Sequence, residues 1–174
     1  MADLTKGAST RRVQYAALPF RRRGNLLTEV MLVTSLRRGR WIIPKGWPMK
    51  RRAPHASAAL EALEEAGVVG QVGKRAIGSF SYEKRLKQGD VILCKVHVFP
   101  LEVKRQQKSW PEKGKREVQW FSPSEAAERV QEPVLGDIIR SLQKRPNSGS
   151  APRPQLVYRT RSRARARKNG SILI

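Results

Sequence analysis

The chain has 174 residues, 39% of them hydrophobic, and a formal net charge of +22 that comes from 36 Lys and Arg against 14 Asp and Glu. This length suits one domain plus a tail, and the charge favours polyanionic partners such as nucleic acid, polyphosphates or acidic membranes. The single cysteine, Cys94, excludes an internal disulfide, no apolar run approaches the roughly 20 residues that span a bilayer, and residues 1–12 lack the apolar stretch of a signal peptide, so we expect a soluble cytoplasmic protein.

Composition divides the chain into three parts. We expect residues 1–11 to be a flexible, polar N-terminus, residues 12–144 to be one folded domain, and residues 145–174 to be a disordered tail. The last part holds eight Lys and Arg and no acidic residue, so it supplies +8 of the net charge. Five arginines alternate with other residues between 159 and 167. In an extended chain they would share one face and could dock on a polyanion, although a solvated, disordered tail is the commoner explanation of such a charge run.

The folded part reads as strands interrupted by a few helices. Runs rich in Val, Ile, Leu and aromatic residues predict strands at 13–20, 27–35, 41–43, 68–72, 75–82, 91–104 and 117–121. Between the third and fourth strands, a loop over 45–53 precedes a helix over 54–66, with Pro54 in its first turn and Gly67 as a left-handed cap. Ser122 and Glu125 form a capping-box pattern that starts another helix, and a last helix is expected over 133–144.

Three glutamates lie close together in this basic chain. Glu61, Glu64 and Glu65 occupy positions i, i+3 and i+4 of the helix predicted over 54–66, so they share one face and are expected to converge. Converging carboxylates repel one another unless a hard divalent cation holds them. Magnesium fits best, because it prefers oxygen ligands and keeps waters that a phosphate substrate can displace.

The segment 46–68 resembles the Nudix box, which reads Gly, five residues, Glu, seven residues, then Arg-Glu-aliphatic-any-Glu-Glu-any-Gly-aliphatic. Six residues of this chain match at the right spacing, namely Gly46, Glu61, Glu64, Glu65, Gly67 and Val68. Two positions depart from it, because Arg52 stands in place of a glutamate and Leu60 in place of the arginine. The flanking residues 40–46 and 116–121 resemble those of diphosphoinositol polyphosphate phosphohydrolases, and the likeness covers about 12–144.

The resemblance implies an α/β Nudix fold, with a mixed β-sheet sandwiched between α-helices, and Mg²⁺-dependent hydrolysis of a diphosphate linkage. By position, Glu61, Glu64 and Glu65 would be metal ligands and catalytic residues, helped by a backbone carbonyl at or beside Gly46, and Mn²⁺ is expected to substitute for Mg²⁺. Either a box glutamate or Glu112, in the predicted loop over 106–115, could be the general base. Leu60 cannot orient a box glutamate as an arginine would, and Arg52 either weakens the metal site or clamps phosphate.

Basic residues surround the proposed metal in the sequence. Those expected to bind an anionic polyphosphate substrate are Arg37, Arg40, Lys45, Lys50 and Arg52, because arginine binds phosphate bidentately and lysine as a point charge. Diphosphoinositol polyphosphates and diadenosine polyphosphates both suit this charge. The alternative is a catalytically weak member of the family that binds RNA or another polyanion through its scaffold and basic tail.

Overall fold

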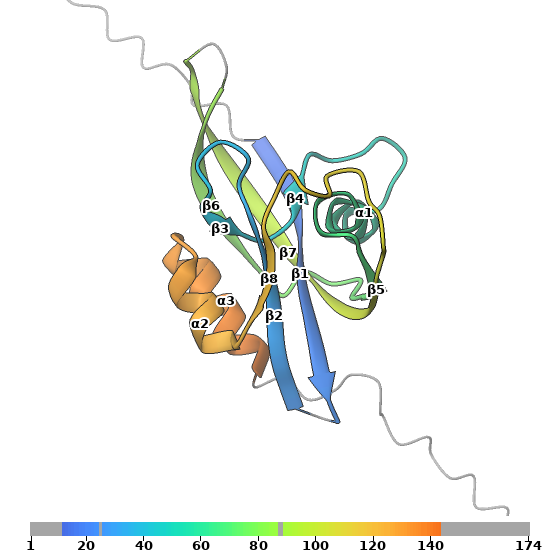
Figure 1. The fold of residues 1–174 in the computed structure, drawn as a ribbon. Coiled ribbons are helices and arrows are strands. Elements are labelled where there is room, and N and C mark those ends of the chain that lie inside the picture. The colour runs from blue at the N-terminus through green and yellow to red at the C-terminus, as the bar shows by residue number, and fades with distance from the viewer. Residues whose placement is uncertain (1–11, 25, 87–88, 144–174) are drawn as a thin grey trace, which may run out of the picture.

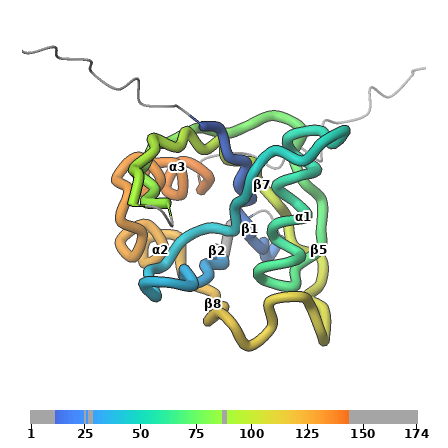
Figure 2. The backbone as a smooth tube through the Cα atoms, turned by 90° about the horizontal axis from the view of Figure 1, so that it is seen from above, coloured from blue at the N-terminus to red at the C-terminus, as the bar shows by residue number. Residues whose placement is uncertain are grey.

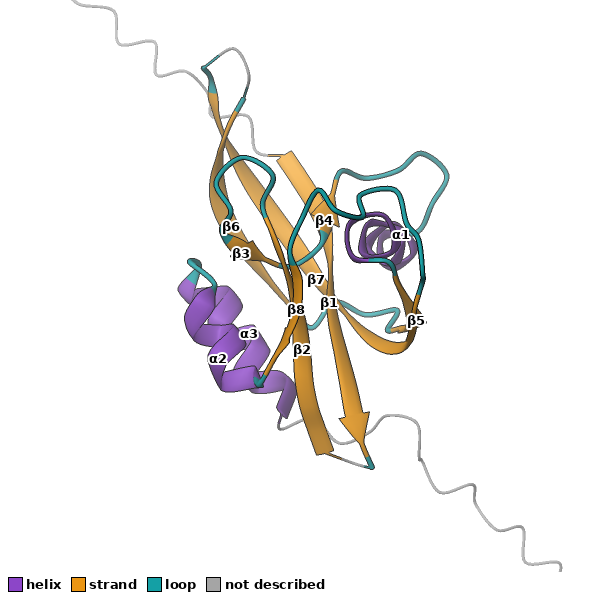
Figure 3. Ribbon diagram, viewed as in Figure 1, coloured by secondary structure: helices purple, strands orange, loops and turns teal. Residues whose placement is uncertain are grey.

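The computed structural model describes residues 12–24, 26–86 and 89–143, so the predicted N-terminal segment and basic tail lie outside the described residues. The described part contains eight strands and three helices (Figures 1 and 3). In chain order they are β1 (Arg12–Arg23), β2 (Leu26–Thr34), β3 (Trp41–Ile42), β4 (Lys45–Gly46), α1 (Pro54–Ala66), β5 (Val68–Val72), β6 (Gly78–Arg85), β7 (Val91–Gln106), β8 (Val118–Phe121), α2 (Pro123–Arg129) and α3 (Pro133–Gln143).

All eight strands belong to one mixed sheet. Its main path runs β3-β2-β1-β7-β5, with β4 paired to β1, β6 to β7 and β8 to β2. The pairing of β1 with β7 is parallel, and the other pairings are antiparallel. The sheet separates α1 from the pair α2 and α3, which lie on opposite sides of it (Figures 1 and 2). The mixed sheet between helices that the sequence predicted is therefore confirmed.

Strand β1 supplies side chains to both layers of the core. Ala16, Leu18 and Phe20 belong to the cluster under α2 and α3, whereas Ala17 belongs to the cluster under α1. This alternation follows from the two-residue period of a strand. Because both faces are covered, β1 reads in the sequence as an almost continuous apolar run.

Helix α1 packs on the sheet through small side chains. Ala58, Ala62 and Ala66 follow one another at intervals of four residues and are fully buried. Their methyl groups let the helix backbone approach the sheet closely. The helix runs from Pro54 to Ala66, and Gly67, with φ = 71°, forms the expected left-handed cap by donating its amide hydrogen to the carbonyls of Ala62 and Leu63.

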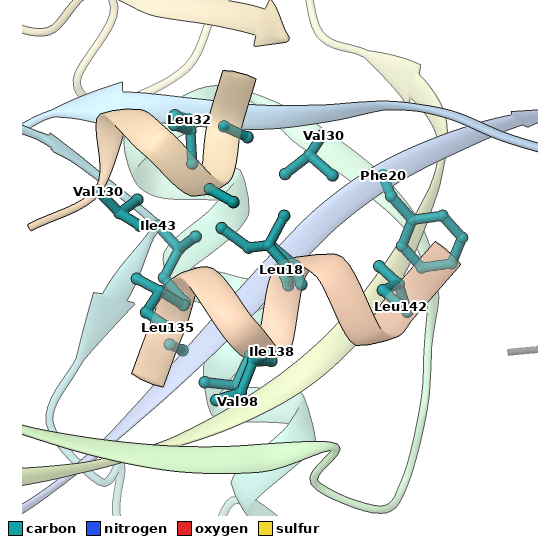
Figure 4. Close-up of a cluster of buried hydrophobic side chains, with 14 of the residues drawn as sticks. Leu18, Phe20, Val30, Leu32, Ile43, Val98, Val130, Leu135, Ile138 and Leu142 are labelled. Carbon is teal, nitrogen blue, oxygen red and sulfur yellow. The ribbon is translucent and has the colours of Figure 1, made fainter. Parts of the chain in front are cut away.

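The opposite face of the sheet is covered by α2 and α3. The capping box at the start of α2 is present: Ser122 Oγ accepts a hydrogen bond from the Glu125 amide, and Glu125 accepts one from the Ser122 amide. Leu135, Ile138 and Leu142 of α3 point toward the sheet residues Leu18 and Val98 (Figure 4). This cluster is the larger of the two cores.

The loop from 107 to 117 crosses the end of α1 before it enters β8 (Figure 2). Its first residue, Gln107, donates its amide hydrogen to the carbonyl of Gly67 at 2.7 Å. The Glu112 amide donates to the Glu64 carbonyl at 3.1 Å, and the Gln106 side chain donates to the Ala66 carbonyl at 2.9 Å. The loop thus satisfies carbonyls that a helix end leaves without intrahelical partners.

Candidate functional site

The packing of α1 decides where its three glutamates lie. Glu61 and Glu65 are one turn apart and border the buried alanine stripe, because each lies one residue before Ala62 or Ala66. Glu65 is buried, while Glu61 and Glu64 are half-buried. The glutamates therefore lie at the rim of the helix–sheet contact, on a helix that the sheet holds in place.

Arg116 joins three separate segments beside this helix. Its Nη2 donates to Glu65 Oε1 at 2.8 Å, its Nη1 donates to the Thr34 carbonyl at 2.9 Å, and its Nε donates to Glu112 Oε2. The side chains of Arg116 and Glu65 are only 8% and 9% exposed, and that of Glu112 is 26% exposed. The predicted loop acid Glu112 thus lies at the site, held by a buried arginine.

The environment opposes the charged forms of two glutamates and a lysine. Burial raises the pKa of Glu65, although the Arg116 guanidinium and the Lys45 ammonium oppose that rise. Burial, Glu64 and Glu112 raise the pKa of Glu61. Burial also lowers the pKa of Lys45 to about 8, a fall that the attraction of Glu65 limits. Perturbed pKa values of this kind are typical of functional sites such as active sites.

Gly46 is the point where strand β4 meets the glutamates. A Cβ atom on this residue would collide with the carboxylate of Glu61. Glycine therefore leaves the space that the Glu61 carboxylate occupies, and a larger residue at position 46 would displace that carboxylate. The contact brings the first and second matches of the predicted box together in space.

The donor set fits a hard cation, although the carboxylates are not gathered around one point. Among the described residues, no three His, Cys, Asp or Glu side chains meet closely enough to hold a metal ion as they are placed. The expected convergence is incomplete because Glu65 turns to Arg116 and Glu61 lies against Gly46. Glu65 Oε2, however, is buried and has no hydrogen-bond partner within the part of the chain that the structure describes. That orphaned oxygen, beside a second carboxylate with a raised pKa, suits a Mg²⁺ ion.

A basic groove of about 790 Å³ opens beside Arg116. It lies between the β2–β3 loop and the hairpin of β6 and β7. The cationic residues that line it are Arg37, Arg38, Arg40, Lys84, Arg85 and Arg116. The groove also contains Glu83, so its lining carries a clear excess of positive charge next to the acidic cluster.

The structure brings some of the predicted phosphate-binding residues together and leaves others apart. Arg37 and Arg40 line the groove, and Lys45 lies next to Glu65 with its ammonium over the Tyr82 ring. Lys50 and Arg52 are exposed and are not among the residues that line the groove. Their loop, 47–53, projects from the α1 side of the sheet (Figure 1), so closeness in sequence to Gly46 did not place them in the groove.

Arg116 is the site residue that the sequence did not single out. It was noted only as part of a strand flank, and its partner Glu65 lies 51 residues earlier. One signal was present, because Glu112 and Arg116 are four residues apart and of opposite charge. That spacing alone does not predict that the pair closes over the helix.

Comparison with known families gives a match over most of the chain. The model described as "NUDIX domain" matches residues 10–142. Nudix hydrolase 21, chloroplastic, of Arabidopsis thaliana is 30% identical over 125 residues, which are 71% of this chain and 61% of that protein. Diphosphoinositol polyphosphate phosphohydrolase 3-alpha of Mus musculus is 31% identical over 133 residues, 72% of this chain and 77% of that protein. The match thus spans less than two thirds of the plant relative.

Solved structures share the fold at low sequence identity. An Ap4A hydrolase from C. elegans in a binary complex superposes with a TM-score of 0.56 at 16% identity, over 76% of this chain and 96% of the other. A NUDIX hydrolase from Nitrosomonas europaea gives 0.57 at 17% identity, over 78% and 90%. Within the described residues, no helix is both long and apolar enough to cross a membrane. The cytoplasmic location stays a prediction.

Proposed function

The chain belongs to the Nudix family, and from that premise we propose that it is a Mg²⁺-dependent hydrolase that cleaves a diphosphate linkage in a highly phosphorylated small molecule. The observation that carries the proposal is the position of Glu65. It is a buried carboxylate with one unpartnered oxygen, and its ion-pair partner Arg116 lines a basic groove. Metal-binding and phosphate-binding chemistry are therefore adjacent.

The glutamates of α1 would hold the metal. Glu61, Glu64 and Glu65 offer carboxylate oxygens, and Gly46 brings the backbone of β4 against Glu61. When bound, Mg²⁺ neutralises phosphate oxygens and makes a coordinated water more acidic, and Mn²⁺ can take its place. Gathering them around one ion requires the carboxylates to move from their present positions among the described residues.

Proton removal from the attacking water needs a carboxylate near the metal. We propose either a glutamate of α1 or Glu112 for this step. Glu112 is tied to Arg116 and to the end of α1, so the loop holds it within the same cluster. Burial and the neighbouring Glu64 and Glu112 raise the pKa of Glu61, and an upward shift favours the role of a general base.

The groove favours a substrate with several phosphates. Apart from the buried Arg116, its arginines can each engage a phosphate through two parallel N–H donors. Diphosphoinositol polyphosphates and diadenosine polyphosphates both meet this requirement, and the names of the mouse relative and of the C. elegans structural neighbour support these two classes. An RNA-binding role for the described domain has no comparable support in the groove, which adjoins the acidic cluster.

A phosphate-release screen tests the proposal. The full chain would be incubated with Mg²⁺ and, in turn, inositol pyrophosphates, dinucleoside polyphosphates, nucleotide sugars and nucleoside triphosphates. Glu64→Gln should lower kcat by about 100-fold or more, because it removes a metal ligand while preserving size. Glu128→Gln, on the exposed surface of α2, is the matched control and should leave kcat unchanged. Equal turnover by wild type and Glu64→Gln would refute the metal assignment.

A further inference from the structure

A buried arginine from outside α1 holds one oxygen of Glu65 and leaves the other without a partner. Arg116 donates to Glu65 Oε1, whereas Glu65 Oε2 is buried and unpartnered among the described residues. An ion pair whose only role was stability would gain from engaging both oxygens in a bidentate contact. Here the contact fixes the carboxylate and keeps one oxygen available.

Arg116 is itself held rigidly. Three of its nitrogens are used at once, on the Glu65 carboxylate, on the Glu112 carboxylate and on the backbone carbonyl of Thr34. The Thr34 carbonyl lies at the end of strand β2, so this hydrogen bond fixes the position of the guanidinium relative to the sheet. Its side chain is 8% exposed. Lysine could not reproduce this arrangement, because it carries its charge on one nitrogen and lacks the planar fork.

The chain lacks a cation at position 60, where the residue is Leu60. Leu60 lies one turn before Glu64, and the residues one turn before Glu65 are Glu61 and Ala62, so α1 offers Glu65 no basic neighbour. Arg116 supplies a positive charge to Glu65 from the loop between β7 and β8. The charge reaches the glutamate through tertiary structure instead of through the helix.

We propose that Arg116 is the positioning residue of this site: it orients Glu65 so that Oε2 is presented to the divalent cation. The inference rests on the proposed function, because it concerns how this chain prepares a ligand for that metal. Arg116 acts through Glu65 and not through direct contact with the metal.

The test measures Mn²⁺ binding to the metal-free full chain by electron paramagnetic resonance, so that it does not depend on turnover. Arg116→Lys should weaken Mn²⁺ binding by about 10-fold or more, as loss of a partner that orients a ligand does. In a Glu65→Gln background, the same substitution should change the Kd by less than about 3-fold, because the residue through which it acts is already altered. Arg140→Lys, in the exposed ion pair with Asp137, is the matched control.

Turnover gives a second readout. If Arg116 positions Glu65, Arg116→Lys should lower kcat by about 10–100-fold while KM changes by less than about 3-fold. A rise in KM with unchanged kcat and unchanged Mn²⁺ affinity would show that Arg116 contacts substrate in the groove, and would overturn the inference. Additive losses in the Glu65→Gln background would also overturn it.

A second variant covers the case in which Arg116→Lys does not fold. Glu112→Gln keeps the size of the side chain but weakens one of the three arginine contacts, and it should weaken Mn²⁺ binding by about 2–10-fold. Unchanged binding in a folded Glu112→Gln protein would count against the inference. If wild type binds Mn²⁺ and neither variant alters the Kd, the inference alone fails. If wild type binds no Mn²⁺, the proposed function fails with it.

Discussion

At the scale of single residues, Glu61 illustrates how the site lowers the stability of the metal-free fold. Its carboxylate is pressed against Gly46 and lies near Glu64 and Glu112. Burial and these like charges raise its pKa, which means that the folded state disfavours its ionised form. A bound cation would remove that penalty.

This reasoning predicts a pH-dependent stability gain for Glu61→Gln in the presence of a chelator. A carboxyl whose folded pKa is raised binds more protons in the folded than in the unfolded state, so its penalty is absent below the unfolded value and grows as pH rises through the folded one. Glu61→Gln should therefore have a higher Tm than wild type at pH 8, and the gap should close toward pH 4.5, the ordinary glutamate value.

Calorimetry at the two pH values measures this gap, with Glu128→Gln as the control for loss of an exposed carboxylate. A Tm difference that is the same at pH 8 and pH 4.5 would show that the Glu61 carboxylate is not destabilising. Saturating Mg²⁺ should raise the Tm of wild type more than that of Glu61→Gln.

The sequence predicted the site residues that one helix carries and missed those that only tertiary structure supplies. Glu61, Glu64 and Glu65 follow from helical spacing, and Gly46 follows from the likeness to the box. The Arg116–Glu65 pair closes over a long chain separation, so no local pattern encodes it. Lys50 and Arg52 are near Gly46 in the chain but outside the groove lining, and their binding of phosphate stays a prediction.

At the scale of elements, the end of α1 and the loop that crosses it form one unit. Gly67 has φ = 71°, and a Cβ added there would lie 2.5 Å from the Trp110 ring. The glycine is needed both for its left-handed backbone and for the close approach of the indole. Trp110 is thus an anchor for the loop that carries Glu112 and Arg116.

Gly67→Ala and Gly114→Ala separate these two requirements. Gly114, in the same loop, has φ = 81° and open space around it, so alanine there bears only the backbone cost, about 1 kcal/mol and roughly 3–5 °C in Tm. Gly67→Ala should lower Tm by at least about twice as much, because Trp110 must also move. It should also lower kcat, whereas Gly114→Ala should not.

Thermal denaturation and the phosphate-release assay measure both effects. Equal Tm losses in the two variants would mean that the Trp110 contact contributes little to stability. A Gly67→Ala protein with full activity would show that the loop does not depend on its anchor to hold Glu112 and Arg116.

Elements with strong local signals were predicted well. The bounds of α1 were correct, because proline, the alanine stripe and the terminal glycine all agree. Strand β6 begins later than the predicted residue 75 and continues to Arg85, past the predicted end at residue 82. Pairing with β7 explains this extension, since charged residues can occupy a strand whose backbone is hydrogen-bonded. Strand β4 was missed because its two residues are defined only by pairing with β1.

The helix packing also needed one correction. In the sequence, Ala59, Ala62, Leu63 and Ala66 read as residues that can pack on the sheet, but the buried alanines are Ala58, Ala62 and Ala66, together with Ser57 and Glu65, while Ala59 and Leu63 are half-buried. The true stripe repeats every four residues. Hydrophobicity favoured Leu63, whereas close packing selected the smaller side chains.

At the scale of the whole molecule, charge is divided between the groove and a tail outside the described residues. The basic tail supplies +8 of the +22, and its role in binding polyanions stays a prediction. Both the groove and the tail would attract anions over a distance that salt shortens, to roughly 8 Å at physiological ionic strength.

Deleting residues 146–174 tests the tail separately from the groove. If the tail docks on polyanions, the truncated chain should bind a single-stranded RNA probe more weakly and with a shallower dependence of log K on log salt. The kcat on the small-molecule substrate should be unchanged, because the site lies within 12–143. Identical salt slopes for the full and truncated chains would rule out docking through the tail.

The parallel pairing of β1 with β7 has a consequence for synthesis. Arg12 pairs with Cys94 and Phe20 with Glu102. Strand β1, the first described strand to leave the ribosome, therefore cannot complete its pairing until β7, one of the last, has been synthesised. A hairpin with β2 can form early, but the other edge of β1 keeps its backbone groups and apolar side chains open until β7 emerges. During that interval the nascent chain exposes an aggregation-prone strand edge. The yield of folded protein in the cell should therefore depend on chaperones that bind this edge.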